Sequence, residues 1–495
     1  MLEVKNLNVF DGHFHDETLL RNINFSMVTG DRIGVIGPSG AGKSLLASTI
    51  IQLLPKSLHR NGEVWFDSVD LFLASRKTLD NLRGKEISII FQNPEATFNP
   101  VFTIGKQIDE AITIHNNMPK SERKDLVFQW MEKAQLVDFD RYYNSYPHQL
   151  SGGQLQRLSV IMSLINLPKL VIADEITASL DNENASIIMR MLEEHAQKPD
   201  HGLMVISHDL NQILPLCNKL LFLNGGEQQY FGNVYDGVNN AKLKEYLDFK
   251  LPDKAKDKHD GLVLLKLEKV SKSYFIPRIL KSQEVVVLKD ISMVIHENEI
   301  VGICGPSGSG KSTFAKILVG IETFDDGAIT WNGVVYQKKY LPKPQDIQIV
   351  FQDSYHSFNP HYTMRSLLKE LLFVHRRLYI GRKYEEIISP LMSDFGLNEG
   401  LLNKYPAQLS GGQRQRFAIL QAILLKPKCI VFDESFSALD MQNISEIMHI
   451  LFKIKEKSNL SIIVISHNVD VLKKMTDRIF EFVGGNLKVL DSSVS

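Results

Sequence analysis

The sequence predicts an α/β protein built from two similar halves, each with a largely parallel sheet that helices cover on both faces. The halves are visible as a repeat: GPSGAGKS at 37–44 recurs as GPSGSGKS at 305–312, and LSGGQ at 150–154 recurs at 409–413. Within each half, short continuous apolar runs such as RIGVIG and LVIADE alternate with helical patterns, which is typical of parallel strands buried on both faces. At 495 residues the chain is also too long for one ordinary core.

A charged stretch between the repeats marks the domain boundary. KLPDKAKDKHDG has alternating charge and few apolar residues, and a solvated helix is the alternative to reading it as a linker. We expect a first domain at 1–249, a linker at 250–261 and a second domain at 262–495. Strand signals fade at 93–150 and 353–409, which predicts a helical subdomain inserted into each domain.

Composition argues against several classes of protein. Hydrophobic residues make up 44% and charged residues 23%, and the net charge is −1, so no global field recruits nucleic acid or an anionic membrane. Cys217, Cys304 and Cys429 lie far apart without C-x-x-C spacing, which argues against a zinc site and fits a reducing cytosol. No secretory signal and no apolar run near the ~20 residues that cross a bilayer is visible. We expect any membrane association to come through a partner.

A G-x-x-x-x-G-K-S motif follows a strand and opens a helix in each half. Its glycines let backbone N–H groups converge on phosphates, and the helix N-terminus favours negative charge. Coincidence does not account for two matches in this context. We expect the lysines to pair with phosphates and the serines after them to ligate Mg²⁺. The predicted binding residues are Gly37, Ser39, Gly40, Gly42, Lys43 and Ser44, with Gly305, Ser307, Gly308, Gly310, Lys311, Ser312 and Thr313.

Two acidic residues end an apolar strand in each half. A carboxylate at the tip of a buried strand loses its hydration, which argues for a cation partner. Asp174 and Asp433 therefore suit the Mg²⁺ shell, and Glu175 and Glu434 suit a base that orients water against a γ-phosphate. An isolated acid at this position is more often a cap or solvated, but the Gly-rich loop in the same half favours the catalytic interpretation.

A histidine and a glutamine also close strands in both halves. His208 and His467 each follow the aspartate by 34 residues, and this recurrence favours a γ-phosphate contact over a satisfied core or surface histidine. Gln92 and Gln352 end ISIIFQ and IQIVFQ. Their amides can reach both Mg²⁺ and the attacking water, an assignment that depends on the other motifs.

LSGGQ is a second motif in each half that could bind a phosphate. Its serine hydroxyl and glycine N–H groups lie just ahead of a helical run, as in a phosphate cradle. One nucleotide does not need two cradles, so the question is what the second one serves. The residues are Ser151, Gly152, Gly153 and Gln154, with Ser410, Gly411, Gly412 and Gln413 in the second half.

In this order, and twice, these motifs resemble those of ATP-binding cassette (ABC) ATPases over nearly the whole chain. FQNPEATFNPVFTIGKQIDE and YPHQLSGGQLQR further resemble the oligopeptide, dipeptide and nickel importer branch. The resemblance implies two tandem P-loop NTPase cassettes, each a mixed sheet core with an antiparallel β subdomain and an inserted helical subdomain. ATP and Mg²⁺ are the implied cofactors.

The resemblance also implies what LSGGQ serves. ABC cassettes pack head to tail, and each ATP is held between the Gly-rich loop of one and the LSGGQ of the other. One chain with two cassettes is then expected to form its own dimer. Ser151 would contact the ATP held by Lys311, and Ser410 the ATP held by Lys43.

The chain departs from the family pattern after each strand-end glutamate. Ile176 and Ser435 stand where the family usually has proline, whereas the loop aspartates Asp181 and Asp440 are kept. For adenine stacking, Tyr274 is the candidate in the second half. In the first half Phe10 is the nearest aromatic residue, about one position out of register, and a core role fits it equally.

The function that the resemblance implies is the ATP-hydrolysing subunit of an ABC importer for peptides, nickel or a metal chelate. The implied partners are two integral-membrane permease subunits and an extracytoplasmic substrate-binding protein, with no nucleic acid, and the implied place is the cytoplasmic face of the cell membrane. Phe98, Phe102 and Phe358 are candidates for the permease-binding grooves, although core packing is the better expectation for each. The alternatives are a soluble tandem ABC ATPase acting on ribosomes and the fused ATPase of a vitamin or metal energy-coupling transporter.

Overall fold

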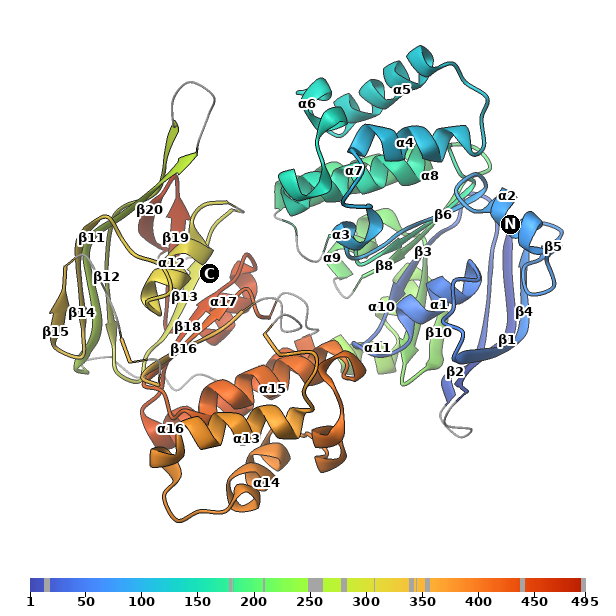
Figure 1. Ribbon diagram of the computed structural model, residues 1–495. Helices are drawn as coiled ribbons and strands as arrows, with labels where there is room; N and C mark the ends of the chain where they lie inside the picture. Colours follow the sequence, from blue (N-terminus) through green and yellow to red (C-terminus); the bar gives the residue numbers. More distant parts are fainter. Residues whose placement is uncertain are drawn as a thin grey trace. The chain divides into compact units, whose positions relative to one another are not determined.

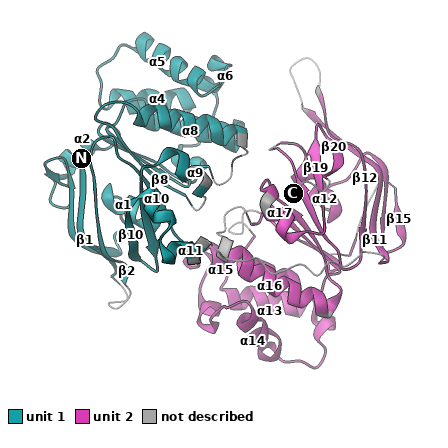
Figure 2. Ribbon diagram, turned by 180° about the vertical axis from the view of Figure 1, so that it is seen from behind, with its two compact units in different colours: residues 1–248 teal, residues 249–495 magenta. Residues whose placement is uncertain are grey.

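The computed structural model separates into two compact units, Met1–Asp248 and Phe249–Ser495 (Figure 2). The expected linker lies outside the described residues except for Gly261. The structure describes residues 1–12, 18–177, 180, 182–207, 210–247, 261–276, 283–306, 308–337, 342–343, 345–351, 357–436 and 441–490.

Unit 1 is built on one mixed sheet with the strand order β5-β4-β1-β2-β10-β9-β3-β8-β7-β6 among its described residues (Figure 1). Strands β6, β7, β8, β3 and β9 run parallel, whereas β1, β2 and β4 pair antiparallel. The strands are β1 Leu2–Asp11, β2 Thr18–Met27, β3 Arg32–Ile36, β4 Leu58–Phe66, β5 Val69–Asp70, β6 Ile87–Ile90, β7 Leu170–Asp174, β8 Gly202–Ile206, β9 Lys219–Asn224 and β10 Glu227–Asn233.

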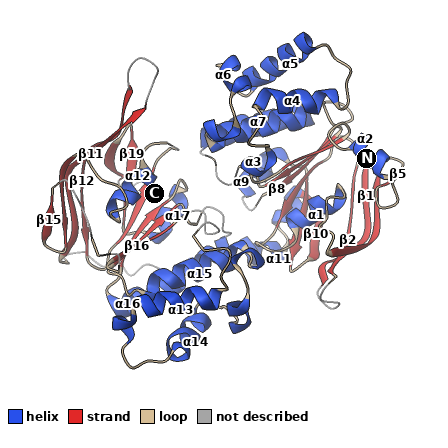
Figure 3. Cartoon of the chain, viewed as in Figure 1, coloured by secondary structure: helices blue, strands red, loops and turns tan. Residues whose placement is uncertain are grey.

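The helices of unit 1 include the insertion that the sequence predicts. Between β6 and the helix that follows LSGGQ, the chain forms α3, α4, α5 and α6; α4 and α5 pack on α7, which in turn contacts β6 (Figure 3). The helices are α1 Lys43–Ile50, α2 Arg76–Leu82, α3 Pro94–Thr97, α4 Ile104–Thr113, α5 Lys120–Lys133, α6 Phe139–Asn144, α7 Gly152–Leu164, α8 Asn182–Ala196, α9 Leu210–Leu216, α10 Val234–Val238 and α11 Ala241–Leu247.

Unit 2 repeats this plan with two separate sheets among its described residues. An antiparallel sheet has the order β12-β11-β14-β15, and a mainly parallel one has the order β16-β17-β18-β13-β19-β20. The strands are β11 Val263–Ile276, β12 Gln283–His296, β13 Ile300–Cys304, β14 Asp326–Trp331, β15 Val334–Tyr336, β16 Ile347–Val350, β17 Cys429–Asp433, β18 Ser461–Ile465, β19 Arg478–Val483 and β20 Asn486–Leu490. The helices are α12 Lys311–Leu318, α13 Met364–Val374, α14 Tyr384–Asp394, α15 Gly411–Leu424, α16 Met441–Ser458 and α17 Val469–Met475.

The continuous apolar strands form the centre of each core. Every residue of β7, β8, β13, β17 and β18 is buried. A strand covered on both faces has no water-facing side, and this explains why these segments are apolar throughout instead of alternating. Their carboxyl ends meet at one edge of the parallel sheet, so the residues that follow them are brought together.

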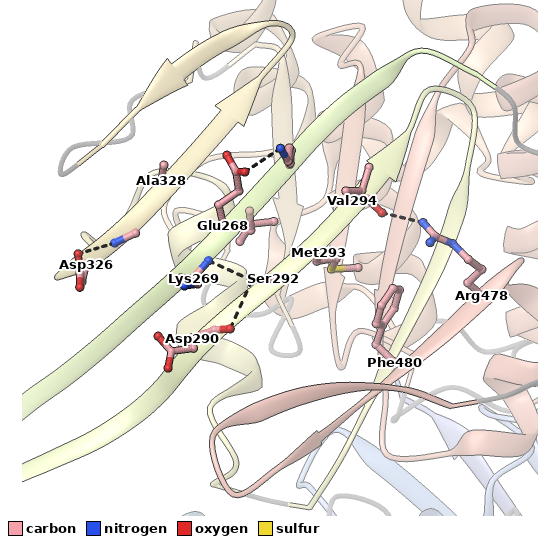
Figure 4. A pocket seen from close by; sticks show the side chains of 13 residues that line it. Glu268, Lys269, Asp290, Ser292, Met293, Val294, Asp326, Ala328, Arg478 and Phe480 are labelled. Carbon is pink, nitrogen blue, oxygen red and sulfur yellow. Dashed lines mark hydrogen bonds and ion pairs between the residues drawn. The ribbon is translucent and has the colours of Figure 1, made fainter.

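A hollow of about 820 Å³ in unit 2 lies where its two sheets meet (Figure 4). In unit 1, Phe231 of β10 packs against Phe25 with the ring centroids 5.8 Å apart, and Phe231 pairs with Leu221. In unit 2 the paired residues are Val489 and Phe480, and Phe480 lines the hollow. The rim mixes cations and anions, including Lys269, Asp290, Asp326 and Arg478, and none of the nucleotide motif residues line it.

Candidate nucleotide-binding sites

The Gly-rich loop of unit 1 joins the buried strand β3 to helix α1. Gly37 and Gly42 have φ of 156° and 91°, and a Cβ at these positions would lie 2.1 Å from the Leu223 carbonyl oxygen and 2.4 Å from a Leu20 methyl. Only glycine fits such a backbone in this space. Gly42 is the N-cap residue of α1. The predicted residues Ser39 and Gly40 lie before it in the loop, and both are exposed.

Lys43 is buried at the start of α1 and crosses back over this loop. Its Nζ donates to the carbonyls of Gly37 and Pro38 at 2.9 and 3.0 Å, and it lies 3.6 Å from Oε1 of Glu175. The side chain is 5% exposed. Among the described residues, the Lys43 ammonium contacts two carbonyls and one carboxylate, so a multiply charged anion that enters the loop can compete for it.

The strand-end residues converge on the same place. Ser44 Oγ donates to Oδ1 of Asp174 at 3.0 Å, and Gln92 Nε2 donates to Oε2 of Glu175 at 3.0 Å. Ser44 lies in the first turn of α1, Gln92 follows β6, and Asp174 ends β7. Residues from three separate segments of the sequence thus form one hydrogen-bonded cluster in unit 1.

The electrostatics of Asp174 favour a bound cation. The side chain is 6% exposed. Burial and the nearby Glu175 raise the pKa of its carboxyl, whereas Ser44 and Lys43 lower it, and the resulting pKa is about 6. Carboxylate and hydroxyl oxygens are ligands that Mg²⁺ prefers. The donor set of Ser44 and Asp174 therefore fits the predicted metal.

Unit 2 builds the same cluster. Lys311 Nζ donates to the carbonyls of Gly305 and Pro306, each at 2.8 Å, and lies 3.5 Å from Oε1 of Glu434. Ser312 Oγ donates to Oδ1 of Asp433 at 3.3 Å. Burial raises the pKa of Asp433 as well.

Other predicted residues of unit 2 are placed less fully. Gly308 and Gly310 lie in the loop, and Gly310 is the N-cap of α12 with φ of 103°. Thr313 is in the first turn of α12. Ser307 and Gln352 lie outside the described residues.

Both strand-end glutamates have left-handed backbones. Glu175 and Glu434 have φ of 47° and 51°, a conformation that costs a non-glycine residue free energy. Each backbone N–H donates to the end of the neighbouring strand, to the carbonyls of Ile206 and Ile465 at 3.0 Å. The same strain in both units indicates that the position of this carboxylate matters more than local stability.

In both units the LSGGQ motif caps its own helix. Ser151 is the N-cap residue of α7; its Oγ accepts from the Gln154 N–H at 3.4 Å, and the Gln154 side chain accepts from the Ser151 N–H at 3.0 Å. Ser410 and Gln413 form the same capping box at α15. A Cβ added at Gly152 or Gly411 would meet no atom within 4 Å, whereas one at Gly153 or Gly412 would approach Asn184 or Asn443. The first glycine of each motif therefore borders open space.

The remaining candidates divide between described and undescribed residues. His467 follows β18 and is half-buried, whereas His208 and the loop aspartates Asp181 and Asp440 lie outside the described residues. Among the groove candidates, Phe98 and Phe358 are buried at 3% and 4% exposed, and Phe102 is 37% exposed.

Tyr274 is exposed on β11 and fixed by a charged cluster. Its OH donates to Oε2 of Glu322 at 3.2 Å, and the Nζ of the buried Lys272 lies 5.2 Å from the ring centroid. Lys272 pairs with Leu288 as Val9 pairs with Leu20 in unit 1. Counting two residues on from Lys272 and from Val9 places Asp11, rather than Phe10, opposite Tyr274.

Sequence reasoning missed one contact at the second site. Ser435, next to Glu434, donates from Oγ to the carbonyl of Val350 at the end of β16. In unit 1 the equivalent Ile176 is buried in the apolar core. A serine in place of the usual proline was the only available signal, and it does not reveal the acceptor.

Comparisons with known proteins show the family of this chain. The pattern of a family described as ABC transporter matches residues 20–178 and 288–437, once in each half. The protein named "Uncharacterized ABC transporter ATP-binding protein YejF" of Escherichia coli K12 is 30% identical, over 97% of this chain and 93% of its own length. The peptidoglycan transport ATP-binding protein YejF of Agrobacterium fabrum is 29% identical, over 99% and 92%. The glutathione import ATP-binding protein GsiA of Escherichia coli O1:K1 / APEC is 29% identical, over 97% and 84%.

Among solved structures, the archaeal ribosome recycling factor aABCE1 matches with a TM-score of 0.62, over 95% of this chain and 87% of its own, at 18% identity. A chain titled RNase-L Inhibitor matches with a TM-score of 0.60, over 94% and 87%, at 19% identity. At this level of identity the likeness shows the fold alone.

Fold and site together define a nucleotide-binding ATPase of the cassette type, present twice in one polypeptide. The chain belongs to the ABC transporter family. The predicted fold class and the predicted ABC importer ATPase with two fused cassettes are confirmed.

Proposed function

We propose that this chain binds Mg²⁺·ATP at the two clusters and hydrolyses it at both, to drive import of a peptide-containing solute. The observation that carries the proposal is the duplicated cluster, with a lysine near a strained glutamate and a serine bonded to a buried aspartate in each unit. The names of the similar proteins, peptidoglycan transport and glutathione import, favour a peptide-containing cargo over nickel or another metal chelate.

The residues of each cluster have different proposed roles in binding Mg²⁺·ATP. Lys43 and Lys311 bind the β- and γ-phosphates. When they do so, the ion pairs of Lys43 with Glu175 and of Lys311 with Glu434 are broken. Ser44 with Asp174, and Ser312 with Asp433, hold Mg²⁺, which when bound supplies charge to the phosphate oxygens.

The glutamates and glutamines complete the reaction. Glu175 and Glu434 each accept the proton of the water that attacks the γ-phosphate, and His208 and His467 contact the γ-phosphate. Gln92 already donates to Glu175, so it connects the base to the segment that begins the helical insertion. Gln352 has the same proposed role in unit 2.

The second phosphate cradle serves the nucleotide of the other unit. In each unit the helix after LSGGQ is capped by the serine of the motif, and the first glycine borders open space. Such a helix N-terminus can bind a phosphate of a nucleotide that the other unit holds. Ser151, Gly152, Gly153 and Gln154 then contact the ATP on Lys311. Ser410, Gly411, Gly412 and Gln413 contact the ATP on Lys43, so that one chain forms a head-to-tail cassette dimer.

The proposed partners are two integral-membrane permease subunits and an extracytoplasmic substrate-binding protein. Within the described part of the chain, no helix is long and apolar enough to cross a membrane. We place the chain at the cytoplasmic face of the cell membrane, where the helical insertions after Gln92 and Gln352 receive the permeases. No nucleic-acid partner is proposed.

The test is reconstitution with permeases encoded beside this chain. We expect the chain to copurify with them and to drive ATP-dependent uptake of a short peptide into vesicles, and the Glu175→Gln, Glu434→Gln variant to bind them without uptake. Cosedimentation with ribosomes and indifference to permeases would instead favour a ribosomal ATPase. Uptake of a vitamin or free metal with a different membrane partner would favour an energy-coupling transporter.

A further inference from the structure

One turn of unit 2 exposes large apolar side chains among cations. Phe373 and Val374 end α13, and Ile380 follows the 3-10 turn Arg376–Tyr379; their side chains are 70%, 66% and 83% exposed. The stretch 373–383, which we call the basic turn, contains no acidic residue. Its cations are Arg376, Arg377, Arg382 and Lys383, all exposed.

The basic turn is anchored to the helix behind it. Tyr379 donates from its OH to the carbonyl of Leu424 at 2.7 Å, and Lys426 donates to the carbonyl of Leu378 at 3.3 Å while lying 4.5 Å from the Tyr379 ring centroid. Burial raises the pKa of Tyr379. The backbone is thus held by α15, and the exposed side chains stand on a fixed support.

The charges of the basic turn are available to a partner. Within the described residues, no acid forms an ion pair with Arg376, Arg377 or Arg382. Residues 373–378 and Gln345 line a shallow hollow of about 610 Å³. Arg376 lies 5.8 Å from the ring centroid of Phe373, so this cation stands beside an exposed apolar ring and, in the described part of the chain, not beside an acid. Exposed apolar side chains that cluster on a surface often mark a binding site.

Unit 1 shows that the fold does not require this surface. The matching helices α4 and α13 begin after Thr103 and Thr363, 260 positions apart. The same spacing places Thr113 opposite Phe373, and Asn116 and Asn117 opposite Arg376 and Arg377. Asn116 is bonded to Asn166 at 3.0 Å, so the turn of unit 1 has asparagines where unit 2 has arginines and closes in part on its own unit. Ile114, opposite Val374, is exposed as well, so the two turns differ in charge and at Phe373.

We propose that the basic turn binds the surface of a bilayer rich in anionic phospholipid. Phe373, Val374 and Ile380 enter the boundary between headgroups and acyl chains, and the arginines meet the lipid phosphates. An acidic peptide would satisfy the cations but leave three apolar side chains in water. The inference deepens the proposed function, because it gives unit 2 its own contact with the membrane beside the permeases; its test does not depend on transport.

The test is cosedimentation of the purified full chain with lipid vesicles. We expect binding to vesicles rich in phosphatidylglycerol and little binding to phosphatidylcholine alone. Arg376→Asn with Arg377→Asn, the residues of unit 1, should weaken binding about 25-fold, because each cation near an anionic surface contributes about fivefold. Phe373→Thr should weaken it as well.

A matched control removes the same charge elsewhere. Arg76→Asn with Lys77→Asn takes two adjacent exposed cations from unit 1 and should leave vesicle binding nearly unchanged. Ile380→Trp adds a direct reporter, whose emission should shift to the blue with phosphatidylglycerol vesicles. All variants should keep the parent's ATPase activity and thermal unfolding.

Three results would overturn the inference: equal binding to both kinds of vesicle, an equal loss in the control pair, or no emission shift from Ile380→Trp. Binding of polyglutamate, lost in Arg376→Asn, Arg377→Asn without any vesicle binding, would assign the turn to an acidic protein. Failure of the proposed function is separate, because it appears as absent ATPase activity or uptake in a chain that still binds vesicles.

Discussion

The ammonium of Lys43 lies 3.6 Å from the carboxylate of Glu175, and Lys311 lies 3.5 Å from Glu434 in the same geometry. In both units the lysine is at least 95% buried, since 5% and 4% of the side chains are exposed. Each proposed phosphate-binding cation is therefore held by the proposed catalytic base of its own unit until an anion takes its place.

The first prediction concerns this pair. Glu175→Gln together with Glu434→Gln should lower ATP turnover by about 10²–10³-fold, because the attacking water loses its base. Nucleotide affinity should stay equal or rise, since the lysines lose the carboxylates that compete with phosphate. Each single variant should keep part of the activity if both sites turn over. Parent-like ATPase rates in the double variant would contradict the assignment of the glutamates.

The second prediction uses the raised pKa of Asp174. Because the pKa rises from 3.8 to about 6 on folding, the group's contribution to stability is complete below pH 3.8 and is lost as pH rises through about 6. The loss at neutral pH amounts to about 3 kcal/mol at 1.36 kcal/mol per pKa unit. Asp174→Asn removes this penalty, so without nucleotide the variant should unfold a few degrees above the parent at pH 7.5, and at the same temperature near pH 4.

The same variant tests the metal. The side-chain amide that Asp174→Asn introduces offers Mg²⁺ a neutral oxygen, so Mg²⁺-dependent stabilisation by ATP should disappear from unit 1, as it should from unit 2 in Asp433→Asn. The measurement is the thermal unfolding midpoint with and without Mg²⁺·ATP at both pH values. A lower midpoint for Asp174→Asn at pH 7.5, or unchanged Mg²⁺ dependence, would count against this account of the carboxylate.

The third prediction separates the two adenine sites. Tyr274→Ala should weaken ATP binding at the second site by about tenfold, within the ~1–3 kcal/mol of base stacking on an aromatic ring. Tyr274→Phe should bind like the parent, because it loses only the hydrogen bond to Glu322. Asp11→Ala should change little at the first site. Titration with a fluorescent ATP analogue measures all three, and an equal loss in Tyr274→Phe would make the hydroxyl, not the ring, responsible.

The positions of the strand-end residues could be predicted from the sequence because parallel strands constrain where their ends lie. LVIADE and CIVFDE are apolar up to their two final acids, so they had to be central strands, and central parallel strands end at a common edge. Asp174 and Ser44 are 130 positions apart and yet bonded at 3.0 Å. Motif order alone was enough to bring them together.

Features that depend on pairing register could not be predicted. The residue of unit 1 that matches Tyr274 is identified from the pairing of β1 with β2 and of β11 with β12. The bond from Ser435 to the Val350 carbonyl depends on the side-chain direction at a strand end. The join of β2 to β10, which makes one sheet in unit 1, rests on a single parallel pair, Arg21 with Glu227, and no sequence pattern indicates it.

The central claim is that each nucleotide is shared between the two units, and intramolecular cross-linking tests it most directly. Two cysteines form a disulfide only when their Cα atoms come within about 7 Å. Cys217, Cys304 and Cys429 are buried, and burial raises the pKa of Cys217 and of Cys429 to about 12. Replacing these three cysteines leaves a background without competing thiols.

In that background, with Glu175→Gln and Glu434→Gln present, Ser39→Cys and Ser410→Cys should form an intramolecular disulfide whose yield rises with ATP. Ser307→Cys with Ser151→Cys should do the same, whereas Ser39→Cys with Ser151→Cys, both in unit 1, should not cross-link. A strong ATP-dependent bridge in that last pair, or bridges found only between separate chains, would contradict nucleotide sharing within one polypeptide.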